Sequence, residues 1–333
     1  MTIPPTDRVR YRPGGEADLD ACTALWKAGI DDYQARLNQP AAADDLRPLR
    51  RLLEHLVTTD PGRFWIADHP AAPGSGPIGF ASATVRGDLW FLAMLFVDPP
   101  SQRNGVGAAL MDRAQVGRGA PGAVVPGPDD PLGTGIRRWG MCTDSAQPVS
   151  NALYARRGMV PRLPIWRLAG EVRRPWALPD LPATLELVEF EALAADGPDG
   201  HRRLADLVNA VDREVIGLEH GQDHAFLRRD GRSGFLVRER GGRPIGYAYG
   251  SGVGRLGPVA ALDPALIPAL IGAAIREIPA GGPVAIWVPG TTTVAFRALL
   301  DAGLRLEGFP GLVCWAGAEH PFERYLPISL ALV

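Results

Sequence analysis

The sequence is poor in lysine, poor in cysteine and free of long hydrophobic runs. Lys27 is the only lysine among 35 basic residues, so catalysis through a lysine Schiff base is not expected. The three cysteines are far apart and form no C-x-x-C pair, which argues against a disulfide framework and a cysteine-rich zinc site. No apolar stretch approaches the roughly 18 residues that cross a membrane.

The sequence also lacks an excess of positive charge. It has 35 basic and 37 acidic residues, and proteins that coat nucleic acids or membrane surfaces need a basic surplus. We therefore expect neither nucleic acid nor membrane as a partner. Residues 1–13 contain no apolar signal core, which predicts a cytoplasmic protein. The length of 333 residues, 46% of them hydrophobic, predicts two globular domains with sizeable cores.

The chain contains two copies of one pattern. The segment PIGFA (77–81) recurs as PIGYA (244–248), and FVDP (96–99) aligns with ALDP (261–264). The spacing between matched segments changes only across stretches that have the composition of loops. Self-similarity of this kind indicates a duplicated unit, here of about 150 residues.

The duplication predicts an N-terminal domain over residues 1–170 and a C-terminal domain over residues 184–333. Residues 171–183 between them are rich in proline, which favours a linker stiffer than a Gly/Ser one. The first copy carries an additional Gly- and Pro-rich stretch at 116–135. That stretch has no hydrophobic periodicity and is predicted to be a surface loop.

Both copies show the same order of elements, β-α-α-β-β-β-α-β-α-β, which predicts an α/β fold with a mixed sheet. A strand at 90–97 is apolar throughout and is expected to be buried in the centre of its sheet. Gly158 can end the helix at 148–157 in a left-handed conformation. The second copy contains a literal GxGxxG at 252–257, but a strand follows it, so we interpret it as a hairpin turn.

The most informative segment follows the strand at 90–97. Residues 102–108 read QRNGVGA, with small residues where a helix is expected to begin. The first N–H groups of a helix have no helical partner and lie at the positive end of the helix dipole. Glycines at 105 and 107 leave room for a ligand near the backbone. The segment therefore predicts an anion site suited to a phosphate.

Two common phosphate loops do not fit this segment. It lacks the Gly-Lys-Ser/Thr of a P-loop and the third glycine of a dinucleotide-binding GxGxxG. The pattern Q/R-x-x-G-x-G/A does fit, through Gln102, Gly105 and Gly107. The segment resembles motif A of the GCN5-related N-acetyltransferase (GNAT) family. The resemblance covers residues 8–168 and, in degenerate form, 184–316. It implies two tandem GNAT-like acyl-CoA N-acyltransferase domains.

The resemblance also implies where acetyl-CoA binds. The family loop holds the pyrophosphate, a role that falls here to Gln102, Arg103, Asn104, Gly105, Val106, Gly107 and Ala108. The central strand of the family splays from its neighbour, and pantetheine fits between the two. This implies that backbone groups of Leu95, Phe96 and Val97 bind the pantetheine arm.

Tyr154 is the expected general acid. The family often has a tyrosine four residues before the helix-ending glycine, here Gly158, and it protonates the departing CoA thiolate. Relatives often carry an asparagine seven residues before this tyrosine. Gln147 stands there, which keeps an amide but changes its reach.

The general base is not evident from the sequence. Many relatives place a glutamate on the central strand, but this strand has no ionisable group, and Phe91 lies near the expected position. Asp144, after the next strand, and Asp31, in the first helix, are two candidates to accept the amine proton. A chain of water molecules leading to solvent is a third possibility.

Neither a cysteine nucleophile nor a histidine metal site is favoured by the sequence. Cys142 lies on a predicted strand with no histidine near it in sequence, so a buried apolar role is favoured over an acyl-carrying nucleophile. His220 and His224 have the i, i+4 spacing of metal ligands, but no third ligand is recognisable and their surroundings read as a loop. No metal is expected.

The second copy lacks both the phosphate-loop residues and the tyrosine of the first copy. The loop residues 102–105 of the first copy align with Ile267, Pro268, Ala269 and Leu270, in that order. Tyr154 aligns with Leu299. A proline removes an N–H donor, and bulky side chains crowd the phosphate position. The C-terminal domain is therefore expected to have lost CoA binding.

These observations predict an acetyl-CoA-dependent N-acetyltransferase. The acetyl group is expected to pass by direct attack to an amine of a small-molecule acceptor, in a monomer or homodimer. Two alternatives stay open: a non-catalytic acyl-CoA-binding regulatory module, and transfer of another acyl group on the same fold.

Overall fold

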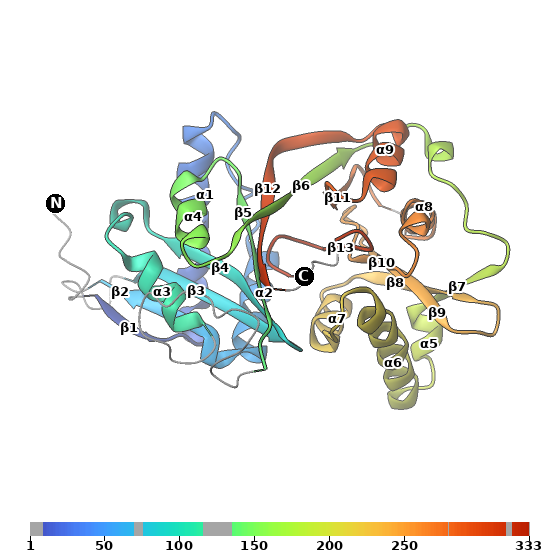
Figure 1. The fold of residues 1–333 in the computed structure, drawn as a ribbon, viewed down its shortest axis with the longest axis horizontal. Coiled ribbons are helices and arrows are strands. Elements are labelled where there is room, and N and C mark those ends of the chain that lie inside the picture. The colour runs from blue at the N-terminus through green and yellow to red at the C-terminus, as the bar shows by residue number, and fades with distance from the viewer. Residues whose placement is uncertain (1–8, 70–75, 116–134, 279, 318–321, 333) are drawn as a thin grey trace. The chain divides into compact units, whose positions relative to one another are not determined.

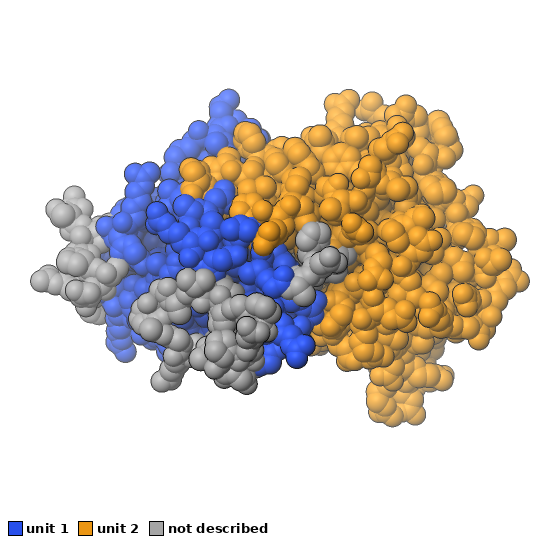
Figure 2. Space-filling view, viewed as in Figure 1, with its two compact units in different colours: residues 1–142, 149–160, 315–317 blue, residues 143–148, 161–314, 318–333 orange. Residues whose placement is uncertain are grey.

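The computed structural model describes most of the chain, namely residues 9–69, 76–115, 135–278, 280–317 and 322–332 (Figure 1). All but the last residue of the surface loop predicted at 116–135 lies outside the described residues. The chain forms two compact units, coloured separately in Figure 2. The first contains residues 1–142, 149–160 and 315–317, and the second contains residues 143–148, 161–314 and 318–333.

Helices and strands are interspersed along the chain, and the predicted mixed α/β fold is confirmed. Up to the end of α4 they are, in chain order, β1 (Arg10–Pro13), η2 (Glu16–Asp18), α1 (Leu19–Arg36), α2 (Arg47–Thr59), η3 (Pro61–Arg63), β2 (Phe64–Asp68), β3 (Pro77–Arg86), β4 (Leu89–Val97), η4 (Pro99–Ser101), α3 (Val106–Ala114), β5 (Arg138–Asp144) and α4 (Pro148–Ala155).

The remaining elements begin with β6 (Val160–Gly170) and η5 (Pro175–Ala177). They continue with β7 (Leu185–Glu189), α5 (Phe190–Ala194), α6 (Pro198–Val215), α7 (Gly221–Arg229), β8 (Ser233–Glu239), β9 (Pro244–Gly250), β10 (Val259–Ala261), η6 (Pro264–Leu266), α8 (Ile267–Glu277), β11 (Val284–Pro289), α9 (Thr293–Ala302), β12 (Arg305–Gly317) and β13 (Tyr325–Leu326).

In the first unit the strands follow the order β1-β2-β3-β4-β5. The pairs are antiparallel except for β4 and β5, which are parallel and are joined through α3. Phe64, Phe80 and Phe96 stack across neighbouring strands with ring centroids 5.9 and 5.7 Å apart, and Trp26 of α1 packs on Phe96. This aromatic stack holds α1 against the sheet.

The repeated motif PIGFA explains how the sheet is covered on both faces. A Cβ added at Gly79 would lie 2.9 Å from Leu110 of α3, so glycine lets that helix approach closely. The next residue, Phe80, joins the stack beneath α1. Because neighbouring strand residues point to opposite faces, α1 and α3 cover opposite faces of the sheet.

The second unit contains strands in the order β13-β10-β9-β8-β7, and β6 lies between β12 and β11. The second copy of the motif acts as the first does. A Cβ at Gly246 would lie 3.1 Å from Leu270 of α8, while the Tyr247 hydroxyl bonds to Asp212 of α6. Helices α6 and α8 therefore cover opposite faces of their sheet.

Each half ends in a strand that is grouped wholly or partly with the other unit. Strand β6 follows α4 in the chain, yet it pairs in antiparallel register with β11 of the second unit. The last residues of β12, 315–317, belong to the first unit. There, Trp315 packs against Gly140 of β5, where an added Cβ would lie 2.5 Å from the ring.

Several local predictions are confirmed and one is wrong. Gly158 has a φ of 82° after α4, as expected for a left-handed helix end. Gly303 has a φ of 111° after α9. The GxGxxG at 252–257 joins antiparallel strands β9 and β10 and opens no helix. The region of His220 and His224 is not a loop, because α7 begins at Gly221. Among the described residues, no helix has the length and apolar character to cross a membrane.

Candidate functional site

The loop between β4 and α3 has an unusual backbone. After the short η4, Arg103 and Gly105 both adopt positive φ angles, 66° and 79°, and Gly105 caps the N-terminus of α3. Left-handed backbone is costly for most residues and costs glycine nothing, which explains Gly105. The two reversals turn the chain sharply from the end of the strand into the helix, and Gln102, Arg103 and Gly105 are exposed.

Backbone N–H groups converge at the start of α3. Within the described part of the chain, the first backbone hydrogen bond of this helix runs from Ala109 N–H to the Gly105 carbonyl. The preceding N–H groups, of Gly105 to Ala108, have no carbonyl partner among the described residues. They lie at the positive end of the helix dipole, with Arg103 beside them. Such a helix start can bind the oxygens of a phosphate.

Side chains of the loop fix its shape. The Gln102 amide donates a hydrogen bond to the Val97 carbonyl at 3.0 Å, and the Asn104 amide donates to the Gln102 carbonyl at 3.2 Å. Both bonds are local and connect the loop to the end of β4. In this geometry Gln102 and Asn104 shape the loop through their side chains, which leaves the backbone N–H groups to face a ligand.

Three of the predicted parts meet at Gly107. A Cβ added there would lie 3.6 Å from Val97 of β4 and 3.9 Å from Leu153 of α4, which are ordinary contacts. The loop, the end of the central strand and the helix of Tyr154 are therefore neighbours. An ion pair 2.8 Å long between Asp112 of α3 and Arg157 joins α3 to the residues after α4.

The end of β4 is separated from β5 on one side. Pairing with β5 runs from Leu89 to Leu92 and stops there, although β4 continues to Val97. On the other side, Ser82 pairs with Met94 and Ala83 with Leu92, so Ala93 is an additional residue in a β-bulge. A bulge bends its strand, and an apolar run of residues gives no sign of it.

Alternation along β4 decides which peptide groups face the opened side. Asp98 N–H bonds to the Ile78 carbonyl of β3, so by alternation the peptide groups of Phe96 also face β3. Those of Leu95 and Val97 face away from β3. Of the three residues expected to bind pantetheine, Leu95 and Val97 thus have the suitable orientation, and Phe96 belongs to the aromatic stack.

Tyr154 lies on α4 and is 5% exposed. Leu153, its neighbour in the helix, faces Gly107, which places this stretch of α4 against the loop. The backbone after Tyr154 turns sharply, because Arg157 and Met159 N–H groups both donate to the Tyr154 carbonyl. The tyrosine is therefore held on a well-defined helix end within the first unit.

The two candidate bases lie in different surroundings. Both oxygens of Asp31 are engaged, Oδ2 by Lys27 Nζ at 2.8 Å and Oδ1 by Ala42 N–H at 2.9 Å. The hydrogen bond from Lys27, and then that from Ala42, lower the pKa of Asp31, which weakens it as a base. Asp144 accepts a hydrogen bond from Ala146 N–H at 2.9 Å and shapes the turn before α4. Asp144 and Gln147 are grouped with the second unit, apart from the loop and Tyr154.

The corresponding helix start in the C-terminal half is closed. The first residues of α8 are all buried, including Ile267, Pro268 and Leu270, where the residues of the first copy are largely exposed. A Cβ added at Gly272, the counterpart of Gly107, would lie 3.1 Å from Leu178 Cβ and 3.2 Å from the Pro179 carbonyl. The proline-rich segment thus covers the helix start that would otherwise face a phosphate.

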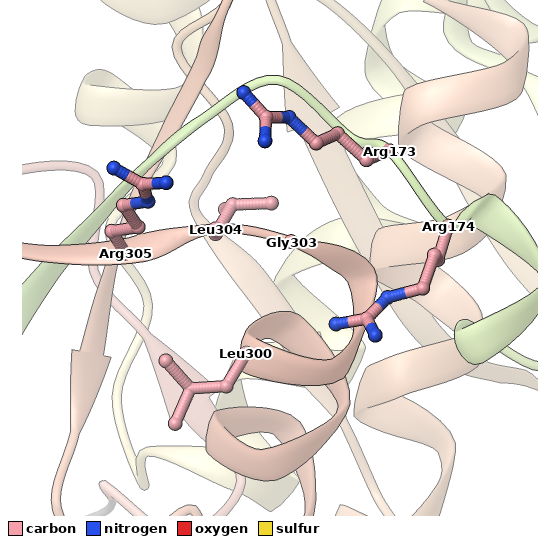
Figure 3. Close-up of a pocket in the computed structure, with 6 residues that line it drawn as sticks. All are labelled: Arg173, Arg174, Leu300, Gly303, Leu304 and Arg305. Carbon is pink, nitrogen blue, oxygen red and sulfur yellow. The ribbon is translucent and has the colours of Figure 1, made fainter.

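A hollow of about 460 Å³ lies elsewhere in the second unit (Figure 3). Its lining includes three exposed arginines from the segment before η5 and from the start of β12, together with apolar residues; the set is Arg173, Arg174, Leu300, Gly303, Leu304 and Arg305. It lies at the C-terminal end of α9, where the helix dipole is negative and opposes anion binding. It is therefore distinct from the helix-start site.

Part of the chain matches the model of a known protein family. Residues 60–158 match the model of the acetyltransferase (GNAT) domain, a segment that contains the loop, the opened strand and Tyr154. This part of the chain is a GNAT domain. No curated protein matches the sequence.

Solved structures extend the fold to the whole chain. A candidate acetyltransferase from Pyrococcus horikoshii aligns with a TM-score of 0.69 at 13% identity, over 100% of this chain and 99% of that one. A GCN5-related N-acetyltransferase from Sphaerobacter thermophilus gives 0.57 at 19%, over 100% of each chain. A tandem GNAT protein from the clavulanic acid biosynthesis pathway gives 0.52 at 16%, over 93% and 99%. The predicted tandem GNAT fold is confirmed.

Proposed function

We propose that this protein transfers the acetyl group of acetyl-CoA to an amine, using the site of its N-terminal half. The observation that carries the proposal is the start of α3, where N–H groups that find no carbonyl partner among the described residues adjoin the end of β4 and the helix of Tyr154. The pyrophosphate would bind the N–H groups of Gly105 to Ala108. The pantetheine arm would follow the opened edge of β4.

The proposed reaction is direct attack. The neutral amine attacks the thioester carbonyl, the carbon becomes tetrahedral, and the C–S bond then breaks to give the amide and a thiolate. Tyr154 donates its hydroxyl proton to that sulfur as general acid. The amine loses its surplus proton through water to solvent, because Asp31 is held in an ion pair with Lys27 and Asp144 is grouped with the second unit. The protein forms no covalent bond to the acetyl group.

The acceptor is proposed to be a small-molecule amine, and a thiol-release assay tests the function. Acetyl-CoA with a panel of amines should release CoA thiol with at least one small amine, in preference to peptides and to longer acyl-CoA donors. Direct attack requires that no thiol be released before an amine is added. Release without amine, accompanied by an acetylated protein, would contradict it.

A cysteine variant supplies the matched control for this assay. Burial raises the pKa of Cys22 and of Cys314 to about 12, so neither is a nucleophile near neutral pH. Cys142 is half-buried on β5, next to the opened strand. C142A should keep its turnover, whereas an acyl-cysteine mechanism would lose it.

A further inference from the structure

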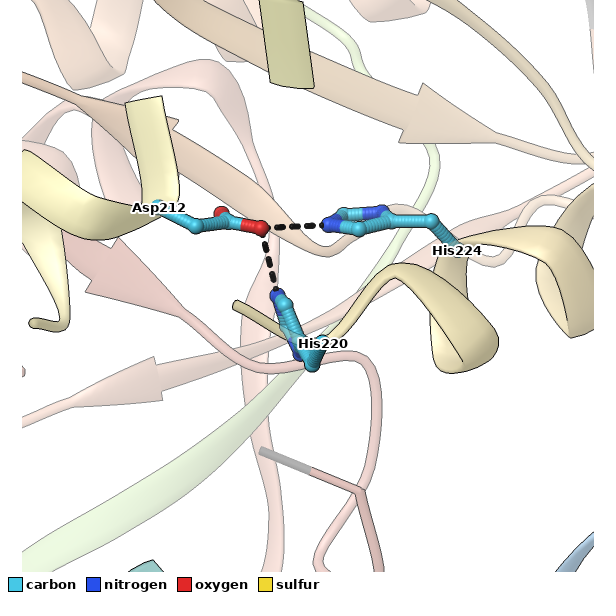
Figure 4. A group of neighbouring side chains, drawn as sticks. All are labelled: Asp212, His220 and His224. Carbon is cyan, nitrogen blue, oxygen red and sulfur yellow. Dashed lines mark hydrogen bonds and ion pairs between the residues drawn. The ribbon is translucent and has the colours of Figure 1, made fainter. Parts of the chain in front are cut away.

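Two histidines and an aspartate converge in the interior of the second unit (Figure 4). Asp212 comes from the last turn of α6, His220 precedes α7, and His224 lies in the first turns of α7. Their side chains are at most 3% exposed. Their candidate ligand atoms all lie within 4.8 Å of one another.

The three ligand atoms form a compact set. Asp212 Oδ2 lies 2.8 Å from His224 Nε2 and 3.1 Å from His220 Nε2. Ligands of tetrahedral zinc, bound at about 2.0–2.2 Å, are separated by roughly 3.3 Å from one another. The two distances to Asp212 Oδ2 thus lie within about half an ångström of that separation, and all three candidate ligand atoms lie within 4.8 Å of one another.

The surroundings resemble the outer shell of a metal site. The second ring nitrogen of His224, Nδ1, hydrogen-bonds with the Tyr249 hydroxyl at 2.8 Å. The second oxygen of Asp212 accepts a hydrogen bond from the Tyr247 hydroxyl at 2.7 Å. Partners of this kind fix the orientation of ligating histidines and carboxylates in metalloproteins.

The fold itself does not require polar residues here. Tyr247 occupies the position in PIGYA that Phe80 occupies in PIGFA, and Phe80 lies in a stack of phenylalanines. The same face is thus filled by apolar rings in one half and by a carboxylate and imidazoles in the other. Burying these groups costs free energy unless a partner compensates it.

The charges favour a cation as that partner. Asp212 is fully buried, and Asp223, 4% exposed, brings a second carboxylate oxygen 3.9 Å from His220 Nδ1. Arg228 interacts with the Tyr249 hydroxyl. A divalent ion between Asp212 and the imidazoles would balance the buried negative charge.

We propose that Asp212, His220 and His224 bind one divalent transition-metal ion. Two imidazoles and one carboxylate are ligands that suit zinc. The ion would connect α6 to α7 and, through the two tyrosines, to β9, and so stabilise the second unit. This site is independent of the proposed transferase chemistry in the first unit.

Elemental analysis of the full chain, purified without a histidine tag, tests the proposal. We expect about one zinc per chain, and removal by a chelator should lower the midpoint of thermal unfolding by on the order of 5 °C, restored by Zn²⁺. H220A and H224A should lose the metal. H201A, which removes an exposed histidine from α6, should keep it.

A measurement on the unchanged chain guards against variants that do not fold. After chelation, Co²⁺ should give the visible absorption of a tetrahedral site at one equivalent, and Zn²⁺ should displace it. Metal content well below one equivalent, with neither a cobalt spectrum nor a gain in thermal midpoint from Zn²⁺, would overturn the proposal. Hydrogen bonds alone would then hold the cluster together, with Asp212 accepting one from each imidazole.

Discussion

G105W should abolish acetyl-CoA binding while leaving the chain folded. Gly105 lies at the exposed N-cap of α3, and an indole there would fill the space in front of the N–H groups that begin this helix. Two lost hydrogen bonds to a charged phosphate, at about 1.5–3 kcal/mol each, correspond to a loss of affinity of about 100-fold or more. Saturating acetyl-CoA should raise the thermal midpoint of the wild type by on the order of 5 °C and leave that of G105W unchanged.

The control for this variant must reproduce its backbone strain. A side chain in left-handed backbone costs about 1–2 kcal/mol wherever it is placed. Gly231 has a φ of 78°, against 79° at Gly105, and an added Cβ there meets nothing within 4 Å. G231W should therefore lose similar stability and keep the full response to acetyl-CoA. An undiminished response of G105W would exclude this helix start as the phosphate site.

Y154F should lower kcat by about 100-fold or more with little change in acetyl-CoA affinity. The substitution removes only the hydroxyl and keeps a buried ring of the same shape. General acids contribute about 10²–10⁴-fold, because the thiolate must otherwise leave without a proton. Steady-state thiol release measures the rate, and calorimetry on the same samples measures the affinity.

Tyr11 offers a matched control for Y154F. It lies on β1, and its ring carries Arg113 at 3.9 Å, a contact that phenylalanine retains. Y11F should keep wild-type turnover. If Y154F turned over at the wild-type rate, another group would protonate the thiolate. If the wild type bound acetyl-CoA without turnover on any amine, the alternative of a non-catalytic binding module would replace the transferase.

Most of the fold could be predicted from the repeated motif. PIGFA and PIGYA each combine a glycine that admits a helix on one face with an aromatic residue that faces the other helix. Such a pattern is local and readable, because side chains alternate along a strand. The helix-ending Gly158 and the hairpin at 252–257 were predictable for a similar reason, since the required conformations are specific to short motifs.

Features that depend on distant residues were not predictable. The destination of β6 beside β11, and of the end of β12 in the first unit, follows from pairing partners more than a hundred residues apart. The cover that Leu178 and Pro179 place over α8 also depends on tertiary contacts. The linker composition indicated stiffness and carried no sign of that contact.

Parts of the candidate site that depend on local sequence were predicted, and parts that depend on distant residues were not. The loop at 102–108 was identified because helix starts with small residues have a recognisable pattern. The bulge at Ala93 was missed, as was the partnership of Asp212 with the histidines. Asp212 precedes His220 by one loop and reaches it only because α6 and α7 pack together.

Calorimetric titration of acetyl-CoA into the full chain tests the central claim most directly. One working site, at the start of α3, predicts one acetyl-CoA per chain, because the equivalent start of α8 is filled by its own side chains and covered by Leu178 and Pro179. Two equivalents would show that the C-terminal half also binds. No binding would show that the loop at 102–108 is only structural and would contradict the account.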